Sequence, residues 1–199
     1  MNFEQRLEDL IGDQDETLDT AISDYLSASA KEVLTAIPLE VKKRYASNNA
    51  VNNNAGLNVS DKEIVDIERS GYGVKQVPLS QKANVADSNS LMYGTKRTPS
   101  YYIDGDVLHI KPDPSATEIA NIKTITYPTV AVDATTISGL PSTAYYAVTI
   151  SAAIKLLHNK LNTHVQEDED SELAQATKLQ IDSLSAMYQS EIQRISTLI

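Results

Sequence analysis

The stretch "YYIDGDVLHIKP", residues 101–112, decides the fold, because it reads as β-structure inside a chain that is otherwise rich in helical patterns. Two runs of β-branched and aromatic residues flank Asp104-Gly105, a pair that tolerates positive φ and gives a strong short-range hairpin signal. Pro112 follows at once, and a proline cannot donate to a sheet ladder. The pattern predicts a hairpin over residues 101–110 that ends before this proline.

Outward from the hairpin, a period of two extends from about residue 64 to residue 132. Short β-branched and aromatic runs alternate there with Gly, Pro, Asn and Asp, which is typical of strands and turns. The Asn-rich stretch "NNAVNNNAGLNVS", residues 48–60, has no period and predicts a loop. The sequence therefore predicts a small antiparallel sheet inserted between helices. The runs are "IVDIER", "GVKQVPL", "SYYID", "DVLHIK" and "NIKTITYP".

Residues 2–46 have a helical period. One apolar stripe runs to Pro38, which ends the helix because the residue before a proline disfavours the helical conformation. A short second helix, "LEVKKRYAS", follows and carries the basic cluster of Lys42, Lys43 and Arg44. This cluster either faces an acidic partner or complements the negative C-terminal end of its own helix, and we favour the second interpretation. The stripe consists of Leu18, Ile22, Tyr25, Leu26, Ala30, Val33 and Ile37.

The chain returns to helix in "GLPSTAYYAVTISAAIKLLHNKL", residues 139–161. Pro141 suits a first helical turn, where its missing N–H costs nothing. The predicted buried face consists of Tyr146, Ile150, Ala153, Ile154, Leu157 and Leu161. Together with the first helix, this face predicts a common core. The predicted core residues are Ile22, Val33, Ile37, Ile150, Ile154 and Leu157.

A last helix is expected from about Ser171 to the end of the sequence. It follows "QEDEDSE", residues 166–172, a charged joint that few buried junctions tolerate because unpaired buried carboxylates are costly. We therefore predict a body of residues 1–165 and a docking helix of residues 166–199, with anchors at helix-in-groove spacing. The alternative is an ordinary closing helix packed on its own domain. The anchors are Ile181, Leu184, Tyr188, Ile192 and Ile195.

Composition narrows the function before any motif is considered. The chain has 199 residues, a net charge of −10 and no cysteine, so it forms no disulfides. An acidic protein does not hold a DNA backbone through its bulk charge, and no apolar run here is long enough to cross a membrane. The acidic start predicts no secretory signal. The expected fold class is α+β: mainly a helical bundle, with an inserted small antiparallel β-region and a long C-terminal helix.

Motifs that carry chemistry are scarce in the sequence. His158 and His164 are six residues apart, which is not a ligand-pair spacing on a helix, and His109 has no second histidine nearby in sequence. The glycines of "GYGVKQ" lack the third glycine of a dinucleotide fingerprint, and no serine lies in a G-x-S-x-G elbow. We predict no enzymatic activity and no catalytic, cofactor-binding or metal-binding residues. The alternative left open is a carboxylate site among the 27 acidic residues.

The order of these parts resembles the head-to-tail adaptor proteins, also called connector or neck proteins, of tailed bacteriophages. The resemblance covers residues 26–161 and rests on three segments, together with a strand in "ITYPTVAVD" that follows the second of them. The first is a small-residue helix that runs into a proline. A tyrosine-rich hairpin that ends in a proline is the second, and a Leu-Pro step into an alanine-rich helix is the third. They are "LSASAKEVLTAIPLEVKK", "SYYIDGDVLHIKPDPS" and "GLPSTAYYAVTISAAIKLLHNKL".

What the resemblance implies is a structural virion protein at the head–tail junction, assembled in the host cytoplasm. Copies would form a dodecameric ring that docks on the portal, extends the DNA channel and joins a downstream tail or nozzle protein. DNA would pass through the lumen during ejection without sequence-specific binding, and the C-terminal segment would reach towards the portal. Two alternatives remain: another ring-forming neck or tail-tube subunit of a phage, and a non-viral oligomeric scaffold.

Overall fold

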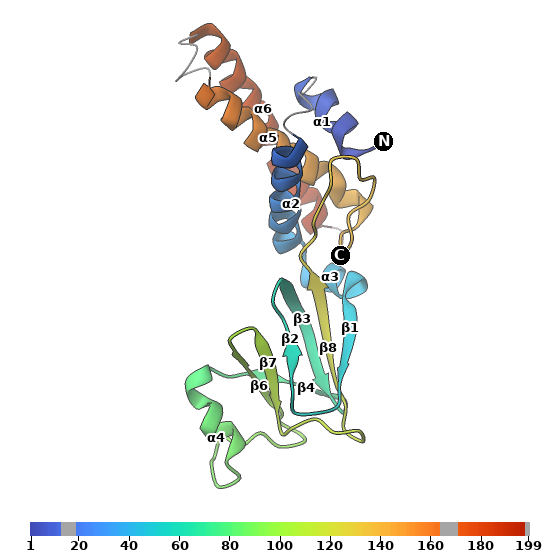
Figure 1. Ribbon diagram of the computed structural model, residues 1–199, viewed down its shortest axis with the longest axis vertical. Helices are drawn as coiled ribbons and strands as arrows, with labels where there is room; N and C mark the ends of the chain where they lie inside the picture. Colours follow the sequence, from blue (N-terminus) through green and yellow to red (C-terminus); the bar gives the residue numbers. More distant parts are fainter. Residues whose placement is uncertain (13–18, 164–170, 198–199) are drawn as a thin grey trace. The chain divides into compact units, whose positions relative to one another are not determined.

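The computed structural model describes residues 1–12, 19–163 and 171–197. The chain divides into two compact units. A helical unit comprises Met1–Tyr45 and Tyr127–Ile199, and a sheet unit comprises Ala46–Thr126 (Figure 1). The sheet unit is therefore a single insertion in the sequence of the helical unit.

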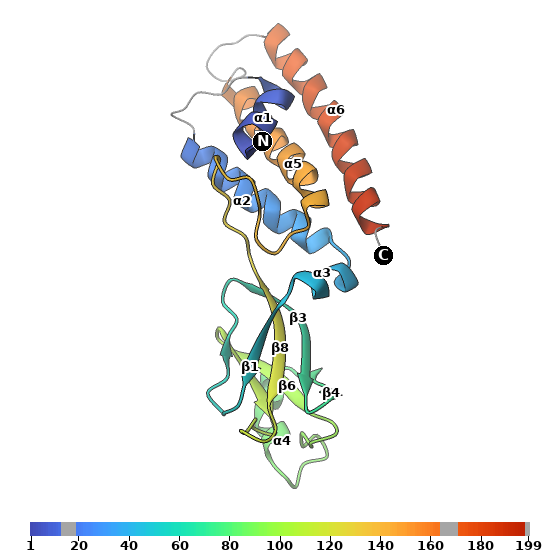
Figure 2. The same cartoon turned by 90° about the vertical axis from the view of Figure 1, so that its right-hand side faces the viewer.

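Three helices, α2, α5 and α6, form the body of the helical unit. Helix α5 packs against both of the others and lies between them (Figure 2). The elements of this unit are α1 (Phe3–Ile11), α2 (Asp19–Ala36), α3 (Leu39–Tyr45), the 3-10 turn η3 (Ser142–Ala144), α5 (Tyr145–Thr163) and α6 (Ser171–Ser196).

Helix α1 is a separate element that the helical period of residues 2–46 does not distinguish. Asn2 and Gln5 form a capping box at its start, which satisfies backbone N–H groups that have no intrahelical partner. Gly12 ends the helix with a φ of 78°, a conformation that favours glycine. On the buried side, Phe3 meets the ring of Tyr145 edge-on at 5.8 Å between centroids, which fixes α1 on α5.

The core of the helical unit follows the two predicted stripes. Ile22, Val33, Ile37, Ile150 and Leu157 are all buried, as predicted, whereas Ile154 is half-buried. Alanines of α5, among them Ala147 and Ala153, have no exposed surface and let α2 approach closely.

Polar groups join the same two helices at the rim of this core. Lys155 Nζ on α5 donates to Ser29 Oγ at 2.9 Å and to a carboxylate oxygen of Glu32 at 2.8 Å, both on α2. One other residue of the predicted stripes differs from expectation, since Tyr146 on α5 is 39% exposed. Leu18 lies outside the described residues.

Eight strands form two four-stranded sheets in the sheet unit. The first sheet has the order β1-β8-β3-β4 and is antiparallel throughout, and the second has the order β2-β7-β6-β5. Their facing sides share one apolar cluster, which includes Ile67, Leu108 and Ile122. The strands are β1 (Ser47–Val51), β2 (Leu57–Asn58), β3 (Lys62–Arg69), β4 (Tyr72–Gly73), β5 (Lys75–Gln76), β6 (Ser100–Asp104), β7 (Val107–Lys111) and β8 (Ala120–Thr126).

The predicted hairpin is confirmed. Strands β6 and β7 pair antiparallel from Ser100 opposite Lys111 to Asp104 opposite Val107. Gly105 in the turn has a φ of 60°, the conformation for which an Asp-Gly pair is suited. Strand β7 ends at Lys111, immediately before the proline.

The expected fold class, a mainly helical bundle with one small antiparallel sheet, is wrong. The described residues are 48% helical and 21% strand, with six α-helices and two sheets of four strands each. The predicted β-region of residues 64–132 is displaced, since the strands run from residue 47 to residue 126. Strands of two residues are too short to display a period of two, so β2 and β4 leave no pattern of their own, and β5 occupies only two residues of the predicted run "GVKQVPL".

The Asn-rich stretch predicted as a loop contains β1 and β2. Asn has a low β-propensity, but here its side chains bond to the neighbouring strand β8. Asn49 Nδ2 donates to Thr124 Oγ1 at 2.9 Å, and Asn48 Nδ2 donates to Asn121 Oδ1 at 3.3 Å. Tertiary pairing therefore overrides the local preference.

Two more features of the sheet unit have no counterpart in the sequence prediction. Strand β5 pairs parallel to β6 over two residues, in a region where only antiparallel pairs were expected. Between β5 and β6 lie a 3-10 turn, η2 (Leu79–Gln81), and the short helix α4 (Lys82–Ala86).

Replacing Leu157 by alanine tests the helical core. Leu157 is 3% exposed on α5, so the Leu157→Ala variant should lose about 2–5 kcal/mol of unfolding free energy, the usual range for truncating a buried leucine. Leu179→Ala on α6 is the matched control because Leu179 is 71% exposed, and it should change stability by about 0.5 kcal/mol or less. Urea unfolding measures both, and equal losses would contradict the assigned core.

Candidate functional site

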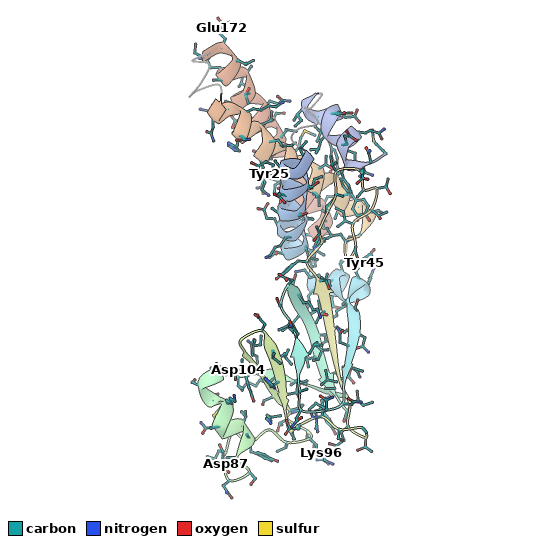
Figure 3. All side chains as sticks on the ribbon, viewed as in Figure 1. Tyr25, Tyr45, Asp87, Lys96, Asp104 and Glu172 are labelled. Atoms are coloured by element: carbon teal, nitrogen blue, oxygen red, sulfur yellow. The ribbon has the colours of Figure 1, made fainter. Side chains whose placement is uncertain are left out.

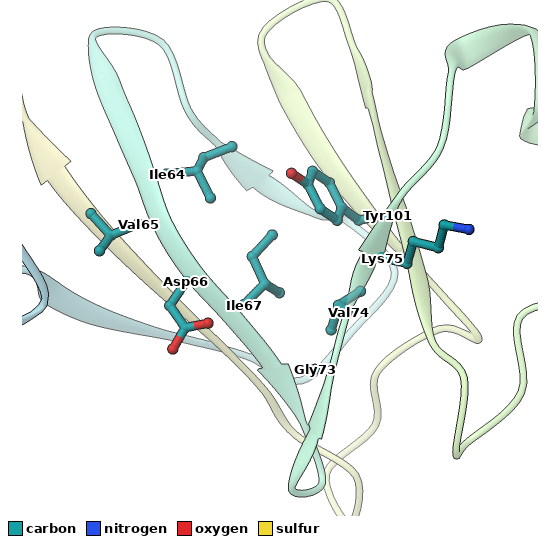
Figure 4. A pocket seen from close by; sticks show the side chains of 8 residues that line it. All are labelled: Ile64, Val65, Asp66, Ile67, Gly73, Val74, Lys75 and Tyr101. Atoms are coloured by element: carbon teal, nitrogen blue, oxygen red, sulfur yellow. The ribbon is translucent and has the colours of Figure 1, made fainter. Parts of the chain in front are cut away.

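A hollow opens between the two sheets of the sheet unit. Its volume is about 450 Å³. Figure 4 shows the side chains of Ile64, Ile67 and Tyr101 directed into the space between β3 and β6. The lining residues are Ile64, Val65, Asp66, Ile67, Gly73, Val74, Lys75 and Tyr101.

A β-bulge in β3 creates the apolar lining. The register against β8 shifts between Ile64 and Asp66, so the strand holds one extra residue there. In a regular strand, residues three apart point to opposite faces, and the extra residue brings Ile64 and Ile67 to the same face. Val65 and Asp66 are turned away from the hollow (Figure 4). Two isoleucines thus point into one space.

The hollow stays open because the outer strands of both sheets are short. Strand β4 pairs with β3 at Glu68 and Arg69 alone, and β5 pairs with β6 at Ser100 and Tyr101 alone. Within residues 46–126, no strand pairs with Lys62–Asp66 on the side away from β8. A free sheet edge beside a hollow is a surface on which another chain can dock.

The lining of the hollow combines apolar side chains with one phenol and two charged residues. Burial raises the pKa of the Tyr101 hydroxyl, so this group stays protonated at neutral pH. Asp66 carries the acid of the lining and lies 4.0 Å from Lys123, while Lys75 is exposed. These groups do not pair a nucleophile with a base, and the lining offers a mixed polar and apolar surface.

A loop of the same unit, residues 87–99, presents two apolar side chains to solvent. Leu91 is fully exposed and Met92 is 42% exposed. The backbone that carries them is nevertheless tied down: Met92 N donates to Ser90 Oγ at 3.1 Å, and Gly94 N donates to the carbonyl of Val85 at 3.1 Å. A Cβ on Gly94 would lie 2.6 Å from the Lys111 carbonyl oxygen, so this close approach requires glycine.

An ion-pair cluster anchors the end of this loop. Arg69 on β3 is 1% exposed, and its Nη2 donates to Glu118 Oε2 at 2.9 Å and to the Asp113 carbonyl at 3.2 Å. Arg69 Nε and Nη1 are buried without a hydrogen-bond partner among the described residues. Lys96, from the loop, pairs with the other oxygen of Glu118. The Glu118 carboxylate therefore balances the charge of the buried Arg69 and anchors the loop through Lys96.

The structure places two of the histidines and the basic cluster that the sequence analysis considered. His109 stacks on Tyr102 at 5.4 Å between centroids, His158 is exposed, and His164 lies outside the described residues. Lys42 Nζ donates to the Thr35 carbonyl in the last turn of α2 at 3.2 Å. The charge of Lys42 thus complements the C-terminal end of α2, the preceding helix, and not the end of its own helix α3.

The predicted portal anchors lie on α6, which packs on α5. Ile181, Leu184 and Ile195 are buried, while Tyr188 and Ile192 are half-buried. Burial raises the pKa of Tyr188, and the charge of Glu32 raises it further. The charged joint before α6 lies largely outside the described residues. The binding of the five predicted anchors to a portal stays a prediction. Such binding would require α6 to separate at least partly from α5.

The hollow and the exposed loop tip of the sheet unit were not predicted from the sequence. Neither the bulge nor the open seam has a sequence signature, since both depend on strand register. The pair Leu91-Met92 does have one, because two large apolar residues stand in a run of polar and turn-forming residues. That signal indicates an exposed apolar tip only once the loop itself is recognised.

The described residues have neither a metal cluster nor a membrane-spanning helix. Within the described ranges, no group of three or more His, Cys, Asp or Glu residues could hold a metal ion. Across the same part of the chain, no helix has the length and apolar character needed to span a membrane. No family model matches the sequence, and no curated protein shows significant similarity to it.

Acid should weaken the sheet unit through Glu118. The hydrogen bond from Lys96, followed by the charges of Lys96 and Arg69, lowers the pKa of Glu118 below its ordinary value of 4.5, against the opposing effect of burial. A lowered pKa in the folded state contributes stability that is present above pH 4.5 and is lost as the pH falls through the folded pKa.

The measurement is thermal unfolding of the natural chain and of Glu118→Gln across a pH series from neutral to acidic. We expect the natural chain to have the higher midpoint at neutral pH and the difference to shrink below pH 4.5. Glu68→Gln, at an exposed residue of the same strand as Arg69, is the control and should leave the profile unchanged. A constant difference at all pH values would contradict the assigned role of Glu118.

Proposed function

We propose that this protein is a head-to-tail adaptor of a tailed bacteriophage, a structural virion protein that forms a homo-oligomeric ring beneath the portal. The observation that carries the proposal is the order of parts. A helix rich in small residues is followed by an inserted β-unit with a tyrosine-rich hairpin, and a Leu-Pro step then opens an alanine-rich helix. This is the order of the family that the sequence resembles.

The packing of the helical unit supports the same proposal. Small residues of α2, including Ser29 and Ala30, have no exposed surface, and α5 packs on α2 through buried alanines. Leu140 and Pro141 are buried where the chain turns into η3 and α5. The two helical segments that carry the resemblance thus pack together within this unit.

The overall charge is compatible with a DNA channel. At a net charge of −10, a ring lumen would repel phosphate, so DNA would slide without being held. In the proposal, the ring extends the channel of the portal and presents a surface to the next tail protein, and no cofactor takes part.

The share of helix favours an adaptor over the tail-tube alternative. A tube subunit should be mostly sheet, whereas the described residues are 48% helical and 21% strand. The non-viral scaffold differs in its genetic surroundings, since an adaptor gene should lie near genes for a portal and a terminase.

The test of the proposal is attachment to the portal protein that is encoded near this chain. We expect the two purified proteins to form a complex in which electron microscopy shows a ring of this chain on the portal. The absence of a portal gene from the surrounding genome, or two proteins that stay separate when mixed, would contradict the proposal.

The predicted anchors on α6 can be tested in the same assay. Tyr188→Ala with Ile192→Ala removes the two anchors that are half-buried and should weaken attachment by roughly tenfold or more, the effect of losing interface anchors. Leu179→Ala, at an exposed position of the same helix, is the control. Thermal unfolding of each variant separates lost stability from lost binding, and unchanged attachment would move the portal interface away from α6.

A further inference from the structure

The turn of the β6–β7 hairpin holds the only Asp-Gly pair in the sequence. Asp104 is the last residue of β6, and Gly105 is the first of the two turn residues that precede β7. Glycine suits this position, because its φ is 60°. No heavy atom outside the neighbouring residues lies within 4 Å of the point that a Cβ on Gly105 would occupy. The chain is therefore open around the Asp104–Gly105 peptide bond.

An Asp-Gly pair can rearrange without an enzyme. The backbone nitrogen of the glycine attacks the side-chain carboxyl carbon of the aspartate, and the new C–N bond closes a succinimide ring. The amide hydrogen and the carboxyl hydroxyl leave together as one molecule of water. A second water molecule then opens the ring at either carbonyl carbon, which restores aspartate or gives isoaspartate. Glycine hinders the attack least, because it has no side chain beside the reacting nitrogen.

Lys82 engages the carboxylate that this reaction would consume. Its Nζ, on α4, lies 2.7 Å from Asp104 Oδ2 (Figure 3). The hydrogen bond and the charge of Lys82 lower the pKa of Asp104, and the charge of His109 also lowers it, against the opposing effect of burial. Ring closure needs the protonated carboxyl, since a hydroxyl can leave as water and a carboxylate oxygen cannot. An ion pair that keeps the group ionised therefore opposes the reaction.

A second contact holds Lys82 over the hairpin. Its Nζ lies 5.7 Å from the ring centroid of Tyr102, on the same strand as Asp104. Tyr102 is buried and stacks on His109 of β7, so the ring is fixed in place. The side chains of Lys82 and Asp104 are nevertheless 52% and 43% exposed, which leaves the pair accessible to water.

We propose that Asp104 is a site of spontaneous isomerisation to isoaspartate, and that Lys82 slows this reaction by holding the carboxylate in an ion pair. Isomerisation would route the main chain through the side-chain carboxyl carbon and add a methylene group at the end of β6. Asp104 pairs with Val107 there, so the change would disturb the hairpin from its turn. The inference goes beyond the proposed function, and portal attachment does not enter its test.

The test is the accumulation of isoaspartate when the full-length chain is incubated at neutral pH. Peptide mapping by mass spectrometry, with fragmentation that distinguishes the two isomers, measures it at each aspartate. In Lys82→Gln, isoaspartate at position 104 should form about two- to fivefold faster than in the natural chain, the factor expected for loss of an exposed ion pair. Lys82→Arg retains the charge and should retain the natural rate.

Two controls isolate the role of the pair. Asp106 lies in the same turn but precedes Val107, whose β-branched side chain crowds the attacking nitrogen, so it should accumulate less isoaspartate than Asp104. Lys75→Ala, at an exposed lysine of the same unit, should leave the rate at Asp104 unchanged.

Hydrogen exchange of the β6 and β7 amides, measured on each variant, separates the ion pair from a loosened hairpin. We expect Lys82→Gln to isomerise faster while these amides keep their protection. Equal rates in Lys82→Gln and the natural chain, or as little isoaspartate at Asp104 as at Asp106, would overturn the inference. A faster rate that follows faster exchange would also overturn it, because the turn and not the ion pair would then control the reaction.

Discussion

The antiparallel pairing of β1 with β8 is the interaction on which the arrangement of the chain depends. It sets Ser47 opposite Thr124 and Val51 opposite Ala120. The first and last strands of the sheet unit are therefore hydrogen-bonded neighbours, although some seventy residues separate them in sequence. Because the chain leaves and rejoins the helical unit through adjacent strands, a sheet unit can be inserted while α2 and α5 still pack together. Without this pairing, closing so long an insertion would oppose formation of the helical core.

The same topology leaves one side of the sheet unit open. Strand β8 is flanked by β1 and β3 and is thereby covered on both edges, whereas the strands furthest from it are only two residues long. A sandwich whose outer strands are this short cannot close the seam between its sheets. The bulge in β3 then turns two isoleucines towards that seam, so an apolar surface forms where neither sheet can cover it. The hollow is a consequence of strand length and register.

Sequence reasoning succeeded where local physics dominates. The Asp104-Gly105 turn defines its hairpin through backbone conformation, and the helical stripes define the core because burial follows period. It failed where contacts between segments that are distant in the sequence determine the structure. Strand β1 is an Asn-rich segment whose extended form depends on β8, and β3 owes its hollow to a bulge that only register shows. The short strands and the anchored loop likewise exist through contacts between segments that are remote in sequence.

The distribution of polar groups explains why such a chain would act through surfaces. In the sheet unit, several charged side chains form ion pairs: Arg69 and Lys96 share Glu118, and Lys82 pairs with Asp104 at 2.7 Å. Groups committed to such pairs position backbone and loops and have little freedom to move protons. Outside these pairs, the unit exposes charged residues such as Glu68 and Arg97 and the apolar tip of Leu91 and Met92. Apolar area without reactive groups can contribute free energy only by being buried against another surface.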